Sequence, residues 1–402
     1  MRNRSMFAHD PLNIKTYAIQ QTEESLPPEQ QKPESESDRL ERARRYSRIR
    51  IKLTIVSTIL FFAVTLLLVS LGVTRWMEDV SYGVSSSPYL ALLVFAVIFG
   101  IVNSIINFPL KVYSGFILEH RFGLSNQSFI AWMWDGLKGM LVGAVIGMPI
   151  LLIFYYFLRT YETNWWLPVG IIMIIFSVIL ARLAPTIIFP LFYKFKPLDD
   201  GELKERILKR CREAGMNVKG IFQFDMSTKT KKANAAFAGI GKAKRIILGD
   251  TLLDEFNHDE IDVVFSHELG HYKLGHIKRM MAVSIVSTMA ALFIAAQLYA
   301  LSIGWFGFES VTQLAALPLL TIWMGLYGLL SGPIDNWLSR RHEYKADRFA
   351  LEMTGNKEAF KSTMTKLAEM NLSDPEPPRW VEVLFHSHPT IKKRIKAAEE
   401  IL

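Results

Sequence analysis

The sequence predicts a mainly α-helical, polytopic membrane protein that also carries a polar catalytic lobe with a small β-sheet. Half of the 402 residues are hydrophobic and the mean hydropathy is +0.20, values typical of chains with membrane helices. The hydrophobic residues gather in runs of about 20, the length at which a helix crosses a bilayer. Polar segments with helical or strand periodicity lie between and after these runs.

The N-terminal segment is polar. Residues 20–40 are rich in Glu, Gln, Pro and Ser and contain few apolar side chains. Such a segment cannot bury enough surface to offset the loss of chain entropy on folding. We therefore expect residues 1–50 to form a disordered tail.

Six hydrophobic runs are long enough to span a membrane. Four of them lie in the part of the chain formed by residues 51–193, and two lie in residues 280–335. The expected spans are 53–73, 89–110, 139–158, 165–189, 280–303 and 314–334.

Basic residues orient these spans, because short cytoplasmic loops collect Lys and Arg. A basic cluster precedes the first span and predicts a cytoplasmic N-terminus, so the polar segments 194–279 and 336–402 are also expected in the cytoplasm. This pattern explains most of the formal net charge of +8, and we expect no nucleic-acid partner. The cluster consists of Arg39, Arg42, Arg44, Arg45, Arg48, Arg50 and Lys52.

The two polar segments are expected to form one catalytic domain on the same side of the membrane. Periodicity predicts strands at 221–226 and 245–248, and prolines predict a loop at 374–378. The predicted helices cover residues 199–213, 254–274, 337–353, 357–370 and 389–402.

The pentapeptide His-Glu-Leu-Gly-His at residues 267–271 predicts a metal site. Residues four apart share one face of a helix, so His267 and His271 can bind the same ion. Glu268 can then reach a water molecule and act as a general base. A hydrolytic zinc site uses three protein ligands and keeps one position for water, so one more ligand is required.

The best candidate for the third ligand is Glu343, with Asp347 one turn later on the same helical face. We expect Asp347 to accept a hydrogen bond from a ligand histidine. The alternative is that both carboxylates are exposed and paired with Arg341 or Lys345. His276 lies at the wrong spacing for a third histidine ligand, and we expect it on the helix surface or behind the ligands.

Several motifs over some 200 residues resemble the CAAX prenyl endopeptidase family, integral-membrane zinc metalloproteases related to the HtpX-type heat-shock proteases. The resemblance runs from about residue 185 to about residue 394. It is carried by the pentapeptide, by Ser339-Arg340 with Glu343 and Ala346-Asp347, by Asn234-Ala235-Ala236-Phe237-Ala238-Gly239, by Arg245-Ile246-Ile247-Leu248, and by Ser387-His388-Pro389 with Arg394-Ile395.

The resemblance implies a zincin-like catalytic domain at the cytoplasmic side of a chamber enclosed by membrane helices. It implies that Asn234 and Ala235 belong to an edge strand that pairs with extended substrate. It also implies that His388 and Arg394 steady the substrate carbonyl oxygen. The family is usually described with seven spans, whereas this sequence predicts six.

These observations lead to the hypothesis of a membrane-embedded zinc metalloendopeptidase with one Zn²⁺ per chain. The expected partners are membrane lipid and a peptide or protein substrate that carries a lipid or lacks one. CAAX-type C-terminal peptides and membrane proteins under quality control both fit, in a bacterial inner membrane or the endoplasmic reticulum. The alternatives are an intramembrane-cleaving metalloprotease and a metal-stabilised transporter or scaffold without catalysis.

Overall fold

The computed structural model describes residues 35–216, 218–238 and 245–401. The chain divides into two compact units, residues 1–41 and 42–402, and the contacts reported below lie within the second. Most of the predicted N-terminal tail falls outside the described residues. The first helix, α1 (Glu36–Ser70), nevertheless begins well before residue 50, so residues 36–50 are helical and the tail prediction is wrong for them.

The early start of α1 has a physical reason in its packing. Ala43 and Tyr46 are buried against Leu118, Phe122 and Leu124. Polarity alone suggested a solvated tail, but apolar side chains three residues apart form one helical face. That face is covered by a segment some 75 residues away, which sequence periodicity cannot anticipate.

Within the described residues, six helices are long and apolar enough to cross a membrane, which agrees with the predicted number of spans. They carry exposed hydrophobic side chains such as Ile105, Val145 and Leu330, which are 67%, 76% and 77% exposed. The six helices are α1, α3 (Pro88–Val112), α5 (Phe129–Tyr161), α6 (Trp166–Leu183), α10 (His276–Ser302) and α11 (Leu317–Thr354).

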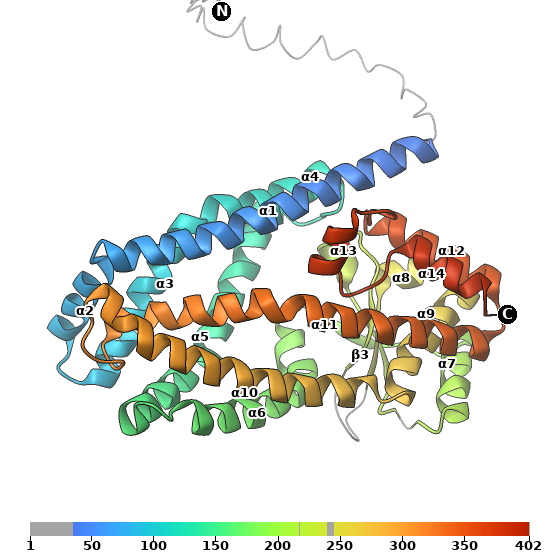
Figure 1. The fold of residues 1–402 in the computed structure, drawn as a ribbon. Helices are drawn as coiled ribbons and strands as arrows, with labels where there is room; N and C mark the ends of the chain where they lie inside the picture. Colours follow the sequence, from blue (N-terminus) through green and yellow to red (C-terminus); the bar gives the residue numbers. More distant parts are fainter. Residues whose placement is uncertain (1–34, 217, 239–244, 402) are drawn as a thin grey trace, which may run out of the picture. The chain divides into compact units, whose positions relative to one another are not determined.

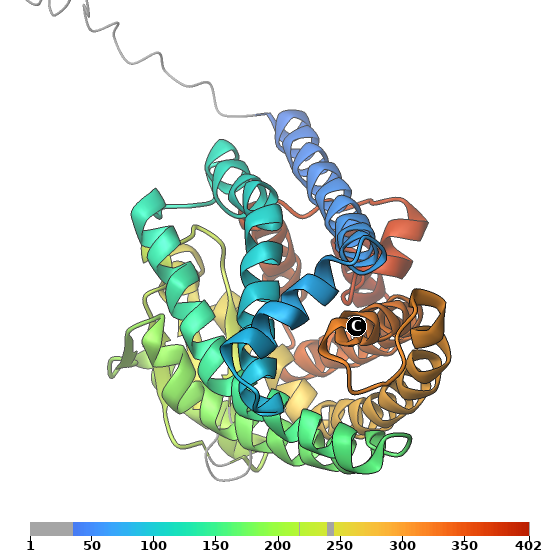
Figure 2. The same cartoon turned by 90° about the vertical axis from the view of Figure 1, so that its left-hand side faces the viewer.

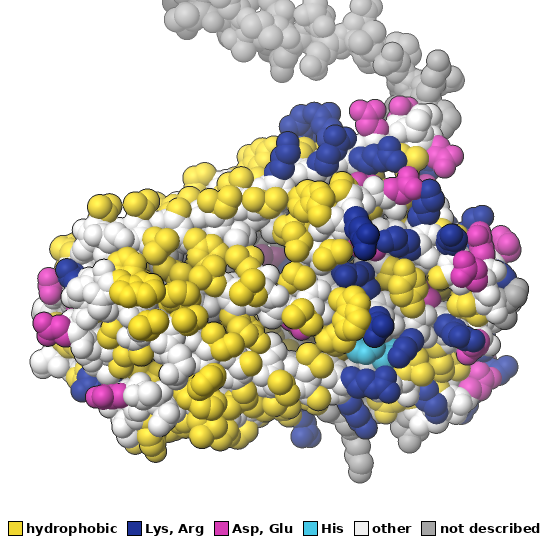
Figure 3. All heavy atoms as spheres, viewed as in Figure 1, with side chains coloured by type: hydrophobic (Ala, Val, Ile, Leu, Met, Phe, Trp, Pro, Cys, Tyr) yellow, Lys and Arg dark blue, Asp and Glu magenta, His cyan; other side chains and the backbone are white. Residues whose placement is uncertain are grey.

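The hydrophobic and charged surfaces are separated along the long helices. The long helices occupy the left of Figure 1, and hydrophobic side chains dominate the same region in Figure 3. Charged side chains gather over the polar lobe on the right, and a smaller group lies at the far left end. This distribution is the one expected when an apolar band sits in lipid between two aqueous faces. The protein is a multi-pass integral membrane protein.

In the part of the polar lobe that the structure describes, four strands form a mixed sheet in the order β1-β2-β4-β3. The strands β2 and β4 are parallel, and the other two pairs are antiparallel. The strand β3 was not predicted from periodicity, because its alanines show no alternation, but it lies at the edge as the family resemblance implied. The strands are β1 (Phe195–Pro197), β2 (Ile221–Phe224), β3 (Ala235–Ala238) and β4 (Arg245–Gly249).

Short helices cover the sheet and join the two polar segments. Val263 of α9 (His258–Lys273) shares a buried cluster with Leu351 of α11 and Phe360 of α12. The two segments thus form one lobe although two spans separate them in sequence. The other short helices are α2 (Val73–Val84), α4 (Leu118–Arg121), α7 (Glu202–Glu213), α8 (Asp250–Glu255), α12 (Lys357–Met370), α13 (Arg379–Phe385) and α14 (Ile391–Glu399).

The helices α10 and α11 form a hairpin, and Figure 2 looks along it. The sequence predicted a span at 314–334 and a helix at 337–353, and α11 runs through both. Pro333 lies inside α11 without ending it, so the span and the lobe share one continuous helix. The start of the hairpin differs from its end, because α10 does not continue directly from α9. Gly275 has φ 70° and bends the chain between these two helices.

Candidate metal centre

The helix that carries the pentapeptide is fixed at its start by a capping box. The side chain of Asn257 accepts a hydrogen bond from the backbone N–H of Glu260, and the carboxylate of Glu260 accepts one from Asn257. Glu260 also accepts hydrogen bonds from Ser362 and Lys366 at 2.5 and 2.7 Å. These contacts tie α9 to α12. The start of the motif helix is therefore held by tertiary contacts as well as by its own cap.

The second helix of the site, α11, approaches α9 closely at Gly270. A Cβ atom built on Gly270 would lie 3.2 Å from the Cα of Ala346 and 3.1 Å from Cδ1 of Phe349. Only a residue without a side chain fits this distance without movement of the neighbours. Because Glu343 stands one turn before Ala346, the close contact brings its carboxylate level with the histidines.

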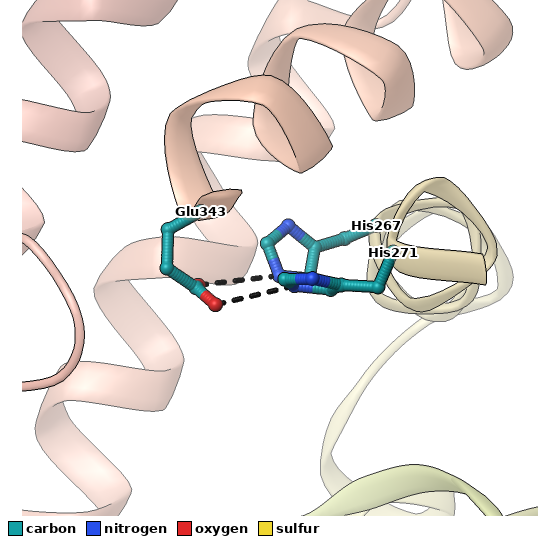
Figure 4. A group of neighbouring side chains, drawn as sticks. All are labelled: His267, His271 and Glu343. Atoms are coloured by element: carbon teal, nitrogen blue, oxygen red, sulfur yellow. Dashed lines mark hydrogen bonds and ion pairs between the residues drawn. The ribbon is translucent and has the colours of Figure 1, made fainter. Parts of the chain in front are cut away.

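The three candidate metal ligands converge, as Figure 4 shows. Nε2 of His267 is 3.4 Å from one oxygen of Glu343, and Nε2 of His271 is 3.2 Å from the other. The three ligating atoms all lie within 4.8 Å of one another, in the one group of this kind found among the described residues. The structure thus brings together His267, His271 and Glu343.

This donor set fits a divalent metal ion. The two Nε2 atoms lie 3.1 Å apart and face each other, an arrangement that a shared cation would stabilise. Two imidazoles and one carboxylate are the ligands of a known class of hydrolytic zinc sites, which leave one position open. The residues present therefore match the requirement of a metal-dependent hydrolase.

Asp347 and Arg394 lie behind His267. Oδ1 of Asp347 is 2.8 Å from Nδ1 of His267, and its other oxygen accepts a hydrogen bond of 2.8 Å from Nε of Arg394. All three side chains are buried. A proton held on Nδ1 by Asp347 leaves Nε2 of His267 as the ligating atom. Arg394 uses two of its nitrogens on Asp347, so the structure places it behind the ligands more than in front of them.

The charge environment of His267 also favours a cation. Burial by itself would lower the pKa of His267, but hydrogen bonds to Asp347 and Glu343 outweigh this and raise the pKa to about 9 when no ion is bound. Carboxylates that stabilise a positive charge on this ring also stabilise a metal ion beside it.

His276 and His342 form a pair behind His271 that the sequence did not predict. Nδ1 of His276 is 3.2 Å from Nδ1 of His271, and the His276 ring stacks on His342 with centroids 4.2 Å apart. His276 is buried. The sequence left its place open between the helix surface and a position behind the ligands, and the structure selects the second. Only the bend at Gly275 allows a residue five positions later to face back toward His271.

Glu268 is half-buried and lies close to the ligand group. Burial raises its pKa above the ordinary value, with the nearby imidazoles of His267 and His271 acting in the opposite direction. A raised pKa makes a carboxylate a stronger base. The arrangement can therefore hold a metal ion with a base next to the open position.

The remaining predicted residues lie around this centre. His388 is exposed, and its Nδ1 is 2.8 Å from Glu343. Asn234 is exposed and directly precedes Ala235, the first residue of β3. The strand β3 pairs only with β4 among the described strands, so its outer edge can accept another strand.

The comparisons with known proteins agree with this geometry. Residues 16–194 match the family described as CAAX prenyl protease N-terminal, five membrane helices, and residues 197–402 match peptidase family M48. In the described part of the first region, four helical segments have span length, one of them running from α3 through α4, and α2 is a further short helix.

Individual relatives cover most of the chain. The uncharacterized metalloprotease YhfN of Bacillus subtilis is 31% identical over 85% of this chain and 80% of its own. CAAX prenyl protease 1 of Saccharomyces cerevisiae is 30% identical over 75% and 70%. The crystal structure of S. mikatae Ste24p has a TM-score of 0.82 at 27% identity, covering 94% of this chain and 92% of that one. With two converging histidines, a carboxylate and an adjacent base on this fold, the chain belongs to peptidase family M48 and is a membrane metalloendopeptidase.

Proposed function

We propose that this protein uses one Zn²⁺ ion to hydrolyse peptide bonds near the C-terminus of CAAX-type substrates, at the cytoplasmic face of a membrane. The observation that carries the proposal is the convergence of His267, His271 and Glu343 within 4.8 Å, with Glu268 beside them. The names of the relatives support the substrate class, and the His and Glu donor set supports zinc.

The protein groups have separate tasks in this mechanism. Zinc, when bound, supplies a Lewis acid that polarises the scissile carbonyl and makes water acidic. Glu268 accepts the proton of the attacking water and then delivers it to the leaving amine. Asp347 keeps the proton of His267 on Nδ1 throughout, which holds the ring in its ligating orientation.

Substrate binding is assigned to the edge of the sheet. An extended peptide adds to the outer edge of β3 at Asn234 and Ala235 through backbone hydrogen bonds. His388 contacts Glu343 through Nδ1, and in the doubly protonated form of the ring its Nε2–H donates to the carbonyl oxygen of the substrate as negative charge develops there. Arg394 contributes by fixing Asp347, and its positive charge acts on the same oxygen from behind.

The test compares the purified wild-type protein with its Glu268→Gln variant on a reporter CAAX peptide, with and without its isoprenoid. We expect zinc-dependent cleavage by the wild type, and loss of turnover in the variant with metal content unchanged by elemental analysis. Cleavage that survives in the Glu268→Gln variant would remove the mechanism. Cleavage of unfolded membrane proteins but of neither CAAX peptide would reassign the substrate to quality control.

A further inference from the structure

A pocket of about 600 Å³ opens next to the metal centre. Its lining includes His388 and Arg394 together with Tyr46, Arg50 and Lys232. This volume lies in the range of pockets that enclose small ligands. The pocket therefore connects the catalytic groups with a second set of polar side chains that the mechanism does not use.

The second set carries a net positive charge. Nη1 of Arg50 is 3.0 Å from one oxygen of Glu119, and Nζ of Lys232 is 2.8 Å from the other. Tyr46 also donates to Glu119, and Lys232 donates to Tyr46 at 3.1 Å. Two cations thus share one carboxylate, which leaves an excess of one positive charge.

Of the other ionisable groups that line the pocket, Asp374 carries one negative charge, equal in size to this excess, but no ion pair joins it to Arg50 or Lys232 in the described part of the chain. Arg394 is balanced by Asp347, and His386 and His388 add no negative charge. Asp374 is the one carboxylate among the residues that line the pocket, and it accepts a hydrogen bond from the backbone N–H of Glu376. The side chains of Arg50 and Lys232 are 53% and 27% exposed. Both can therefore bind an additional anion.

Lys232 lies at the end of the substrate-binding strand. It precedes Ala235, the first residue of β3, by three positions, and its carbonyl accepts a hydrogen bond from Thr251. The carbonyl of Asn234 accepts one from Gly249 at 3.0 Å. The segment that leads into β3 is thus fixed to β4 and α8. It holds Lys232 at the N-terminal end of the free edge.

A peptide that pairs with β3 in the antiparallel sense has its C-terminal end beside the N-terminal end of β3. The residues after the cleaved bond would then run toward Lys232 and Arg50. Three residues in extended conformation span about 10 Å, so a short C-terminal peptide brings its terminal carboxylate to the pocket.

From this geometry we propose that Arg50 and Lys232 bind the free α-carboxylate at the C-terminus of the substrate. The inference rests on the proposed function and deepens it, because it makes the enzyme select cleavage sites by their distance from the chain end. Charge-assisted capture of a terminal carboxylate is a known mode of peptide recognition.

The test uses two reporter peptides of identical sequence that end in a free acid or in an amide. In nanodiscs of neutral lipid, we expect the wild-type kcat/KM to favour the acid by about tenfold or more, the effect of a hydrogen bond between charged groups. Lys232→Gln and Arg50→Gln should each reduce this ratio toward one. Lys231→Gln is the matched control, because it removes the same charge from an exposed neighbour that does not line the pocket.

The acid-to-amide ratio is taken within each variant, so partial misfolding does not alter it. Equal wild-type rates for the two peptides, or an unchanged ratio in both pocket variants, would overturn the inference while leaving the peptidase assignment intact. The binding affinity of both peptides for the Glu268→Gln protein tests the pocket without relying on cleavage. If this protein binds the acid more tightly than the amide while the wild type cleaves neither peptide, the pocket is supported and the proposed function is refuted. Loss of the preference when phosphatidylglycerol is added would assign the pocket to lipid headgroups and also overturn the inference.

Discussion

Each of the two histidine ligands is backed by another side chain through its Nδ1 atom. His267 contacts Asp347, a buried carboxylate, whereas His271 contacts His276, a buried imidazole. In both cases a proton on Nδ1 directs Nε2 toward the candidate metal position. Metal affinity should therefore depend on residues that never touch the ion.

Asp347→Asn should weaken zinc binding by about 10- to 100-fold. The amide cannot accept hydrogen bonds from both Arg394 and His267 without turning its own N–H donors toward one of them. Competition with a zinc chelator of known affinity measures the change. Asp254→Asn, an exposed change on α8, should leave affinity as in the wild type, and equal affinity in the Asp347 variant would argue against the orienting role.

His276→Ala should lower zinc affinity by a similar factor of about 10 to 100, because the Nδ1 proton of His271 loses its acceptor. The same chelator competition applies, with His258→Ala on the exposed start of α9 as the matched histidine control. Affinity that falls equally in both variants would show that the effect does not come from the contact with His271.

The contact between α9 and α11 decides the site at the scale of elements. The sequence places two ligands on one helix, but the third reaches them only because Gly270 lets the helices approach. Overpacked contacts of this kind typically cost about 1–3 kcal/mol, and here the strain falls directly on the metal ligands.

Gly270→Ala should therefore reduce both zinc content and activity, because the new methyl group pushes Ala346 and Phe349 away and moves Glu343 with them. Elemental analysis and peptide cleavage are the measurements. Gly328→Ala in α11 is the control, since a Cβ there meets no atom within 4 Å and alanine favours the helix. A fully loaded and active Gly270→Ala enzyme would contradict the spacing argument.

The start of α9 should make the lobe sensitive to acid. Burial alone would raise the pKa of Glu260, but hydrogen bonds from Lys366 and Ser362 outweigh it and hold the pKa below the ordinary 4.5. A carboxyl with a lowered folded pKa stabilises the fold above its unfolded pKa, and this contribution is lost as pH falls through the folded value.

Glu260→Gln should accordingly lower the Tm at neutral pH. The Tm of this variant should also fall less than the Tm of the wild type when the pH is lowered from neutral to below the ordinary carboxyl pKa. The neutral-pH loss should be at least about 1 kcal/mol, the usual value of a helix cap. Thermal unfolding in detergent at several pH values measures both effects. Glu255→Gln serves as an exposed control on α8, and parallel pH curves for the wild type and Glu260→Gln would refute the explanation.

At the scale of the whole molecule, the apolar band separates the metal centre from the loop between α2 and α3. If the basic residues orient the spans as predicted, the lobe faces the cytoplasm and this loop faces the other side. The single native cysteine, Cys211, is buried, and burial raises its pKa to about 11. A single-cysteine labelling experiment can therefore be built after its replacement.

In a Cys211→Ser background, Ser86→Cys should react with a membrane-impermeant thiol reagent in intact cells, whereas Lys361→Cys should react only after permeabilisation. Both positions are exposed, so access to the reagent depends on the side of the membrane. Labelling of Lys361→Cys in intact cells would place the metal centre on the outer face.

The sequence by itself determined the membrane class and the six spans, and it nominated the three residues that the structure brings together as a candidate metal centre. These features follow from local composition and from helical spacing within single segments, such as the four residues between His267 and His271. The remote partner Glu343 could be nominated because it and Asp347 stand four residues apart on one helical face and because the family resemblance includes both.

Only the tertiary structure decided what depends on contacts between distant segments. Four features join residues that lie far apart or around a sharp bend. They are the helical start of α1, the continuous α11, the pairing of His276 with His271, and the pocket lined by Arg50 and Lys232. Periodicity describes one segment at a time, and it carries no information about which faces meet. The close approach of α9 and α11 at Gly270 is a contact of this kind, and it brings the three candidate metal ligands together.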